Sequence, residues 1–366
     1  MDPLGPIATR FPLVARFRPA CPPLPARVRA LTELADRAVE EDGQGLASTV
    51  FNQAALLASD LGLPELARSM CHRHADAYLR ACPLTAMSAI RGLEPLVNLA
   101  RLQIRAGQPD DGRHRLLDLY EAVGTGSTAV FEGITVPAAL TATAEDRREV
   151  HAWLWRVVLA DGTRTLTTTG RWREALAHIE QHRGVGTRML DGRQVAVVAA
   201  LTGGDRDRAT ALLADTAPGD PWEQAVTACL AVLARRDLPQ GDDSGAAELV
   251  NTFLDREAEP GLTVFDTRLG LAVLDAVGPQ HPGARSLVKD LMGRTTASRN
   301  GYAARDLISH ALFAALATEN EARACRDLIR VCGLGAELLP DDLSSELSTA
   351  LDRSEAVITR SSAAAA

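Results

Sequence analysis

The sequence predicts an all-α protein, an irregular α-solenoid of antiparallel helix pairs with one short non-helical insertion. Hydrophobic residues make up 46% of the 366 residues and aromatic residues only 4%, and the apolar content is mostly Ala and Leu, which favour helix over strand. Apolar residues recur three and four positions apart, as at Leu31, Leu34, Ala35 and Ala38, which is the helical period. Gly and Pro separate stretches of about one helix each.

Residues 1–23 form a proline-rich N-terminal extension, which we predict to be extended. Prolines interrupt its apolar residues, so it lacks the form of a secretory signal, and no stretch of the chain approaches the ~20 apolar residues of a membrane span. Six cysteines are scattered without a CxxC pair in a chain large enough to fold without disulfides. We therefore expect a cytoplasmic protein that does not bind a membrane.

Residues 24–237 are predicted to form a helical-repeat domain, and the repeat signal lies in the joints between its helices. A glycine stands where one helix ends and the backbone must turn left-handed. A small residue follows five positions later, where the next helix packs closely against the first. Four joints have this pattern: Gly62 with Ala67, Gly107 with Gly112, Gly170 with Ala175, and Gly204 with Ala209.

Two segments interrupt the helical pattern. Residues 124–143 are rich in Thr, Val and Gly, and we expect either a β-hairpin or an ordered loop inserted between repeats. Residues 238–245 (LPQGDDSG) form a turn-rich acidic stretch, which we take as the domain boundary. Beyond it we predict further helical repeats over 246–358 and a disordered tail over 359–366.

The glycine-containing joints resemble those of the tetratricopeptide (TPR) class. The interval from Gly170 to Gly204 is 34 residues, which is the TPR period, while the other intervals are 45 and 63, so the array is irregular. This resemblance covers about residues 45–215. The chain also resembles a group of actinobacterial proteins that carry the run WLW…ADGTR…GRW.EAL…LDGRQ, present here between residues 153 and 194. That second resemblance implies no particular activity.

The TPR resemblance implies a groove lined by the first helix of each pair. The TPR groove positions place Arg101 and Arg164 at equivalent sites, with Arg105 one turn along, and such a surface suits carboxylates. Trp153 and Trp155 point about 200° apart on a helix, so we expect one of them to face a partner. The predicted partner-binding residues are Asn52, Arg101, Arg105, Trp155, Arg164, Asp191 and Gln194. The alternative, that these arginines are only solvated, stays open.

Signatures of catalysis, metal binding and nucleic-acid binding are missing from the sequence. A net charge of -8 opposes binding to duplex nucleic acid. There is no P-loop, no GxSxG and no complete dinucleotide fingerprint. Cys71 and His74 share a helical face, and His178 and His182 have i, i+4 spacing, but neither pair has a further ligand cluster at matching spacing. We predict no metal and no cofactor.

These observations favour a non-catalytic scaffold that binds a peptide or partner protein, with an acidic or carboxylate group on the partner and a role in regulation. The alternative is an accessory component or enzyme in peptide or small-molecule natural-product biosynthesis, with residues 124–143 as a lid over the groove. An open concave surface would favour the scaffold, and a deep enclosed pocket would favour the alternative.

Overall fold

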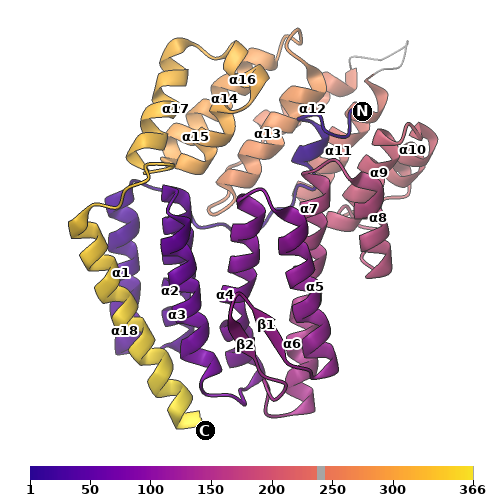
Figure 1. Cartoon of the computed structure of the whole chain (residues 1–366). Helices are drawn as coiled ribbons and strands as arrows, with labels where there is room; N and C mark the ends of the chain where they lie inside the picture. The colour runs from indigo at the N-terminus through magenta and orange to yellow at the C-terminus, as the bar shows by residue number, and fades with distance from the viewer. Residues whose placement is uncertain (237–243, 366) are drawn as a thin grey trace. The chain divides into compact units, whose positions relative to one another are not determined.

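The computed structural model describes residues 1–236 and 244–365, and in this part of the chain the fold is helical apart from one two-stranded sheet (Figure 1). The all-α prediction is confirmed at this level. None of the described helices is both long and apolar enough to cross a membrane.

The chain divides into two compact units, and each is built from two separate stretches of sequence. Unit 1 comprises Met1–Pro23 and Leu166–Cys332, and unit 2 comprises Leu24–Thr165 and Gly333–Ala366. This division differs from the predicted domains, whose boundary at 238–245 lies mostly outside the described residues. The physical reason is long-range packing, because the last helix of the chain returns to the first three helices of unit 2.

Unit 2 contains most of the N-terminal half of the chain. Its elements are α1 (Leu24–Glu40), α2 (Gln44–Leu61), α3 (Pro64–Leu79), α4 (Ala86–Arg105), α5 (Pro109–Thr125), β1 (Ala129–Phe131), β2 (Ile134–Val136), α6 (Ala144–Val157), the π-helix η2 (Val158–Gly162) and α18 (Asp341–Ala365). Successive helices from α1 to α6 pack on one another, α2 and α6 also contact α4, and α18 packs along α1 and α2 (Figure 1).

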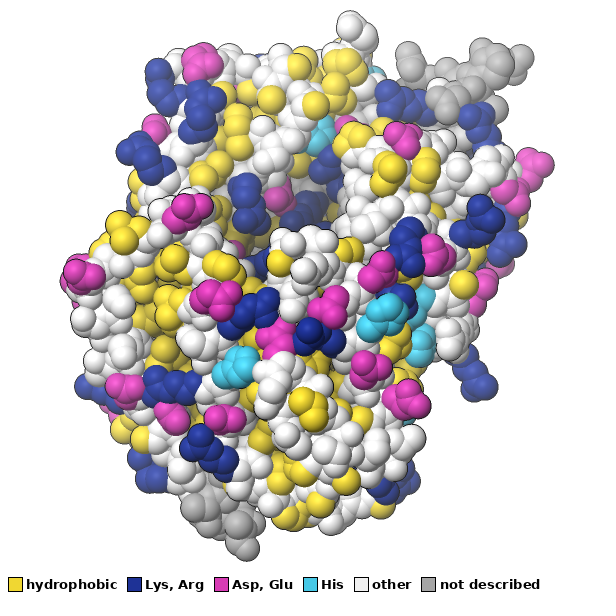
Figure 2. All heavy atoms as spheres, viewed as in Figure 1, with side chains coloured by type: hydrophobic (Ala, Val, Ile, Leu, Met, Phe, Trp, Pro, Cys, Tyr) yellow, Lys and Arg dark blue, Asp and Glu magenta, His cyan; other side chains and the backbone are white. Residues whose placement is uncertain are grey.

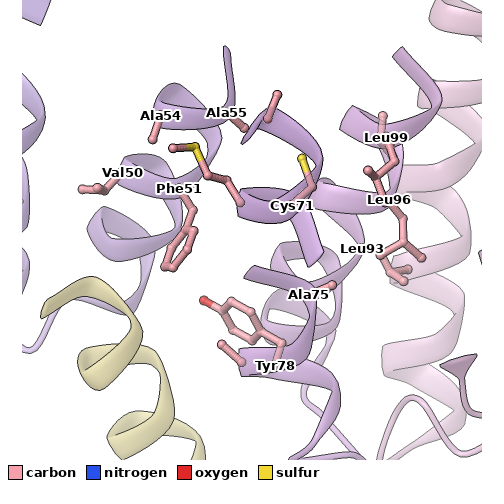
Figure 3. Close-up of a cluster of buried hydrophobic side chains, with 14 of the residues drawn as sticks. Val50, Phe51, Ala54, Ala55, Cys71, Ala75, Tyr78, Leu93, Leu96 and Leu99 are labelled. Carbon is pink, nitrogen blue, oxygen red and sulfur yellow. The ribbon is translucent and has the colours of Figure 1, made fainter. Parts of the chain in front are cut away.

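The core of unit 2 lies between α2, α3 and α4, as Figure 3 shows. Phe51 from α2, Tyr78 from α3, and Leu93 and Leu96 from α4 are almost completely buried there. Each such side chain stabilises the fold by about 1.5–3 kcal/mol through removal of apolar surface from water. This packing fixes the rotation of α2 and α4 about their axes, and therefore fixes which residues they present on their other faces.

Unit 1 contains the N-terminal extension and the remaining helices. Its elements are η1 (Ala8–Arg10), α8 (Trp172–Gln181), α9 (Asp191–Thr202), α10 (Arg206–Ala214), α11 (Pro221–Arg235), α12 (Ser244–Leu254), α13 (Thr263–Val277), α14 (Ala284–Ser298), α15 (Gly301–Ile308), α16 (Ala311–Leu316) and α17 (Glu319–Val331), while α7 (Thr163–Thr167) spans the boundary. Helix α13 is buried along its length among α11, α12, α14, α15 and α16.

All four predicted joints have the backbone geometry that the sequence implies. Gly62, Gly107, Gly170 and Gly204 have φ of 82°, 82°, 72° and 79°. In each joint the glycine N–H donates to the carbonyl three residues back, and the next N–H donates to the carbonyl five residues back. The small residues that follow pack closely: the three alanines are fully buried, and a Cβ on Gly112 would lie 2.7 Å from the carbonyl oxygen of Ala100.

The predicted insertion contains a β-hairpin rather than an irregular loop. Ala129 pairs with Val136, and Phe131 pairs with Ile134. Glu132 and Gly133 form the turn with φ of 48° and 83°, the left-handed pair that a two-residue hairpin turn requires. At the other end of the chain, α18 continues through Ala365, into the tail predicted to be disordered, as its run of alanines allows.

Candidate binding face on helices α2 and α4

A stripe of polar side chains runs along one face of α4. Arg91, Glu94, Asn98, Arg101 and Arg105 are spaced three and four residues apart, so they lie one above another on the helix. All five are partly or fully exposed, whereas the leucines between them point into the core. The same amphipathic pattern that packs α4 therefore presents a continuous polar row.

Asn52 on α2 joins this row through a chain of hydrogen bonds. Its Nδ2 donates to Oε2 of Glu94 at 2.6 Å, and its Oδ1 accepts from Nδ2 of Asn98 at 2.9 Å. Nη1 of Arg101 then donates to Oδ1 of Asn98 at 3.1 Å. Each amide is thus held in one orientation by its neighbours. These side chains therefore lose less conformational entropy when a ligand binds.

Arg101 is fixed further by Asp161 on the π-helix η2. Its Nε and Nη2 donate to the two carboxylate oxygens of Asp161 at 3.1 and 2.8 Å, a bidentate pair. The π-helix widens the turn over Val158–Gly162, and such turns are frequent at functional sites. The side chain of Arg101 is still 49% exposed, so it is both positioned and accessible.

The row continues to both ends of the helices. Towards the C-terminal end of α4, Nη1 of Arg105 donates to Oγ of Ser59. Towards the N-terminal end, the side-chain oxygen of Gln44 accepts from Arg91 at 2.9 Å and from Ser88 at 3.2 Å. We call the complete set the α2–α4 polar face; it consists of Gln44, Asn52, Ser59, Ser88, Arg91, Glu94, Asn98, Arg101, Arg105 and Asp161.

Glu94 is the carboxylate at the middle of this face. Burial raises its pKa above the ordinary value, and the hydrogen bond from Asn52 and the charges of Arg91 and Arg101 offset that rise only in part. The face therefore offers half-buried hydrogen-bonding groups of both kinds, donor and acceptor, together with guanidinium groups. On the side of the molecule in view, Figure 2 shows basic and acidic side chains interspersed.

The structure brings together three of the seven predicted partner-binding residues. Asn52, Arg101 and Arg105 belong to the α2–α4 polar face. Trp155 is partly buried on α6, and Arg164 is exposed on α7.

The last two predicted residues lie on α9 in unit 1 and contact the N-terminal extension of the same chain. Gln194 is completely buried and bonds to the backbone of Leu13. Asp191 accepts from Nη2 of Arg16 at 2.7 Å. The extension thus contacts two side chains predicted to bind a partner; counting repeat positions, which predicted Gln194, does not show which residues the extension itself covers.

A second charged cluster holds the tip of the hairpin. The carboxylate of Glu132 accepts from Nη1 of Arg68 on α3 at 2.6 and 2.7 Å and from Nε2 of Gln103 on α4 at 3.0 Å. Arg115 on α5 lies 3.4 Å from the same carboxylate. The carboxylate bound in this cluster belongs to the chain itself, and these contacts attach the insertion to α3, α4 and α5.

The Cys71 and His74 pair is part of the unit 2 core. Burial raises the pKa of Cys71 to about 12 and lowers the pKa of His74 to about 3, so both side chains are neutral. The His74 ring stacks on Phe51 with centroids 5.0 Å apart. His178 and His182 contact each other with ring centroids 4.8 Å apart. Among the described residues no three His, Cys, Asp or Glu side chains are grouped to hold a metal ion.

Sequence reasoning missed Glu94, Asn98 and Asp161. The spacing of the first two from Arg101 was visible, since 94, 98, 101 and 105 follow the helical period. Asp161 gave no local signal, because it reaches Arg101 from another helix. Comparison with models of known families, with curated proteins and with solved structures gave no match.

Proposed function

We propose that this protein is a non-catalytic scaffold of TPR-like, antiparallel helix pairs, and that its α2–α4 polar face binds a peptide or partner protein in a regulatory role. The observation that carries the proposal is the chain of hydrogen bonds from Glu94 through Asn52 and Asn98 to Arg101 on a partly exposed face. Amide side chains offer both a donor and an acceptor, so they suit the N–H and C=O groups of an extended peptide.

The arginines support an acidic or carboxylate group on the partner. A guanidinium has five N–H donors, and Arg101 uses three of them in hydrogen bonds to Asn98 and Asp161. Arg105 uses one donor in a hydrogen bond to Ser59. The side chains of Arg101 and Arg105 are both about half exposed. The remaining donors are aimed by contacts that already exist, so a ligand carboxylate would meet a preorganised site.

The hairpin contacts favour the scaffold over an enzyme with a lid. Gln103, which binds the hairpin tip, points about 200° away from Arg101 and Arg105 around α4. The hairpin is therefore held on the opposite side of α4 from the polar face. A lid would have to lie over the polar face, so the position of the hairpin favours the scaffold.

Panning a displayed library of random peptides against the full chain tests the proposal. Selected peptides should bind the wild type and lose at least tenfold in affinity with Asn98→Ala and with Arg101→Ala, because each substitution breaks the hydrogen-bond chain; a tenfold loss corresponds to about 1.4 kcal/mol. Arg80→Ala is the matched control, since Arg80 is an exposed arginine directly after α3 that forms an ion pair with Asp76 of that helix.

Retained folding of each variant is checked by thermal melting, so that loss of binding is not loss of structure. Selected peptides that bind Asn98→Ala, Arg101→Ala and Arg80→Ala equally well would contradict the proposal. So would a library that yields no peptide at all for the wild type.

A further inference from the structure

We infer that unit 1 contains a second, separate binding site for an extended peptide of the pattern Arg-Phe-Pro-Leu-x-x-Arg, and that residues 10–16 of this chain are its replaceable resident ligand. A second copy of the chain, which carries the same segment, is the partner that this site fits in trans. The inference does not depend on the α2–α4 polar face, which belongs to unit 2.

The first supporting observation is a main-chain clamp. Oε1 of Gln194 accepts the N–H of Leu13 at 2.6 Å, and Nε2 of Gln194 donates to the carbonyl oxygen of Leu13 at 2.6 Å. The same Nε2 also donates to the carbonyl oxygen of Met189 at 3.1 Å, which fixes the orientation of the amide. One side chain thus satisfies both backbone groups of one extended residue, as a neighbouring strand would.

The second observation is the burial of three successive residues around the clamp. Phe11, Pro12 and Leu13 are buried, with Phe11 0% and Leu13 3% exposed, whereas Val14 and Ala15 are only partly buried. Residues 11–23 form neither helix nor strand, so this burial comes from contacts of individual side chains with the helical framework. Backbone bonding with pockets for selected side chains is how extended peptides are recognised.

The third observation is a carboxylate at each end of the segment. Nη2 of Arg10 donates to Oδ2 of Asp275 at 3.1 Å, and Nη2 of Arg16 donates to Oδ2 of Asp191 at 2.7 Å. Asp275 is almost fully buried, and Nε2 of His310 bonds to its other oxygen at 3.0 Å. Because Nδ1 of His310 accepts the backbone N–H of Phe313, Nε2 carries the proton and donates it to Asp275.

These contacts define what the site selects. An aromatic residue, a proline and an aliphatic residue fill the buried positions, and the buried carboxylate of Asp275 favours a cation at Arg10, since a buried carboxylate left without its partner is destabilised. The more exposed pair of Arg16 with Asp191 contributes less. The segment leaves the site through an exposed stretch that includes Phe17, which is 77% exposed. A cut just beyond this stretch would leave the segment held by noncovalent contacts alone.

The test uses the full chain with a protease recognition sequence inserted between Pro19 and Ala20, cleaved after folding. Native mass spectrometry should find the cleaved segment still bound. A fluorescent synthetic peptide of residues 1–19 should then exchange into the site, as measured by anisotropy. Gln194→Ala should release the segment at least ten times faster, while Gln224→Ala, an exposed glutamine of the same unit, should leave the rate unchanged.

Variants of the peptide keep the test independent of protein folding. N-methylation at Leu13 removes the N–H that Gln194 accepts, and Leu13→Asp places a charge in a buried position; each should weaken binding at least tenfold. Equal binding of the N-methylated peptide would overturn the inference. Failure of the labelled peptide to exchange at any temperature below unfolding, or unfolding of unit 1 on cleavage, would also overturn it, because the segment would then be a fixed part of the fold.

Discussion

At the scale of single residues, close backbone approaches decide which positions tolerate a side chain. Gly112 begins the contact of α5 with α4, and a Cβ there would meet the Ala100 oxygen at 2.7 Å and the Ile104 side chain at 2.8 Å. Gly293 lies on an exposed part of α14, where a Cβ would meet nothing within 4 Å. The two glycines are both helical, so they differ in packing and not in backbone conformation.

Alanine substitution at these two glycines should therefore change the free energy of unfolding in opposite directions. Gly112→Ala should lower the free energy of unfolding by about 1–3 kcal/mol, because the helices must separate to accept the methyl group. Gly293→Ala should raise it by up to ~1 kcal/mol, the difference in helix propensity. Urea denaturation measures both, and a stabilised Gly112→Ala variant would show that the α4–α5 contact is looser than described.

His74 makes the stability of unit 2 depend on pH in the acid range. Burial lowers the pKa of His74 to about 3, and its Nε2 has no hydrogen-bond partner among the residues that the structure describes. An unfolded histidine titrates near ~6.5, so below that pH the unfolded chain binds a proton that the folded chain excludes. The stability that neutral His74 contributes is complete above ~6.5 and is lost as the pH falls towards about 3, at up to about 1.4 kcal/mol per pH unit.

Replacing His74 with phenylalanine should flatten this dependence. Phenylalanine keeps the stack on Phe51 but takes up no proton, so His74→Phe should lose less stability than the wild type between pH 7 and pH 5 in urea denaturation. His72→Phe is the control, since His72 is considerably exposed on the same helix. Parallel curves for the wild type and His74→Phe would mean that the histidine is protonated in the folded protein.

At the scale of elements, the hairpin is held by one carboxylate. Glu132 is only 12% exposed and receives hydrogen bonds from Arg68 and Gln103. Glu132→Ala should lower the free energy of unfolding by about 1.5–3 kcal/mol, the cost of losing hydrogen bonds to a charged group. Glu65→Ala, which removes an exposed carboxylate from the edge of the same cluster, should change stability by less than about 1 kcal/mol.

Hydrogen exchange locates the effect of Glu132→Ala. Amides of residues 129–136 should exchange faster in the variant, because the tip is no longer fastened to α3 and α4, while amides of α2 should keep their protection. Unchanged exchange in the hairpin would show that its buried apolar residues suffice to hold it.

The joints between helices show how far sequence reasoning reached and where it stopped. Glycine followed five residues later by a small residue predicted four left-handed turns, and all four are present. The same hydrogen bonds also occur at Asp42 and Arg183, with φ of 46° and 54°. Those two turns were missed because a residue with a Cβ rarely adopts this conformation, so its identity carries little signal.

The candidate site was predictable on one helix at a time. Arg101, Arg105 and Asn52 follow from counting back from a turn glycine. Their partners across the face required the rotation of α2 and α4, which packing of Phe51, Tyr78 and Leu93 sets, and this is a property of the assembled core. Asp161 joins this face from a separate element, the π-helix η2.

At the scale of the whole molecule, the chain builds its two units from interleaved stretches. The N-terminal segment belongs with the helices that follow Leu166, and the C-terminal helix α18 belongs with α1, α2 and α3. No local pattern indicates such long-range pairing, since α18 and α1 are both amphipathic and would suit many partners. The same interleaving explains why Asp191 and Gln194, predicted for a partner, bind the chain's own extension.

Hydrogen exchange of the full chain with and without a peptide selected by panning tests the central claim most directly. We predict that the bound peptide slows exchange within residues 44–61 and 86–105 and at the π-helix 158–162, and that Arg101→Ala abolishes this protection while Arg80→Ala preserves it. Protection confined to residues 166–332, or protection of α2 and α4 that survives Arg101→Ala unchanged, would contradict the assignment of the α2–α4 polar face as the binding site.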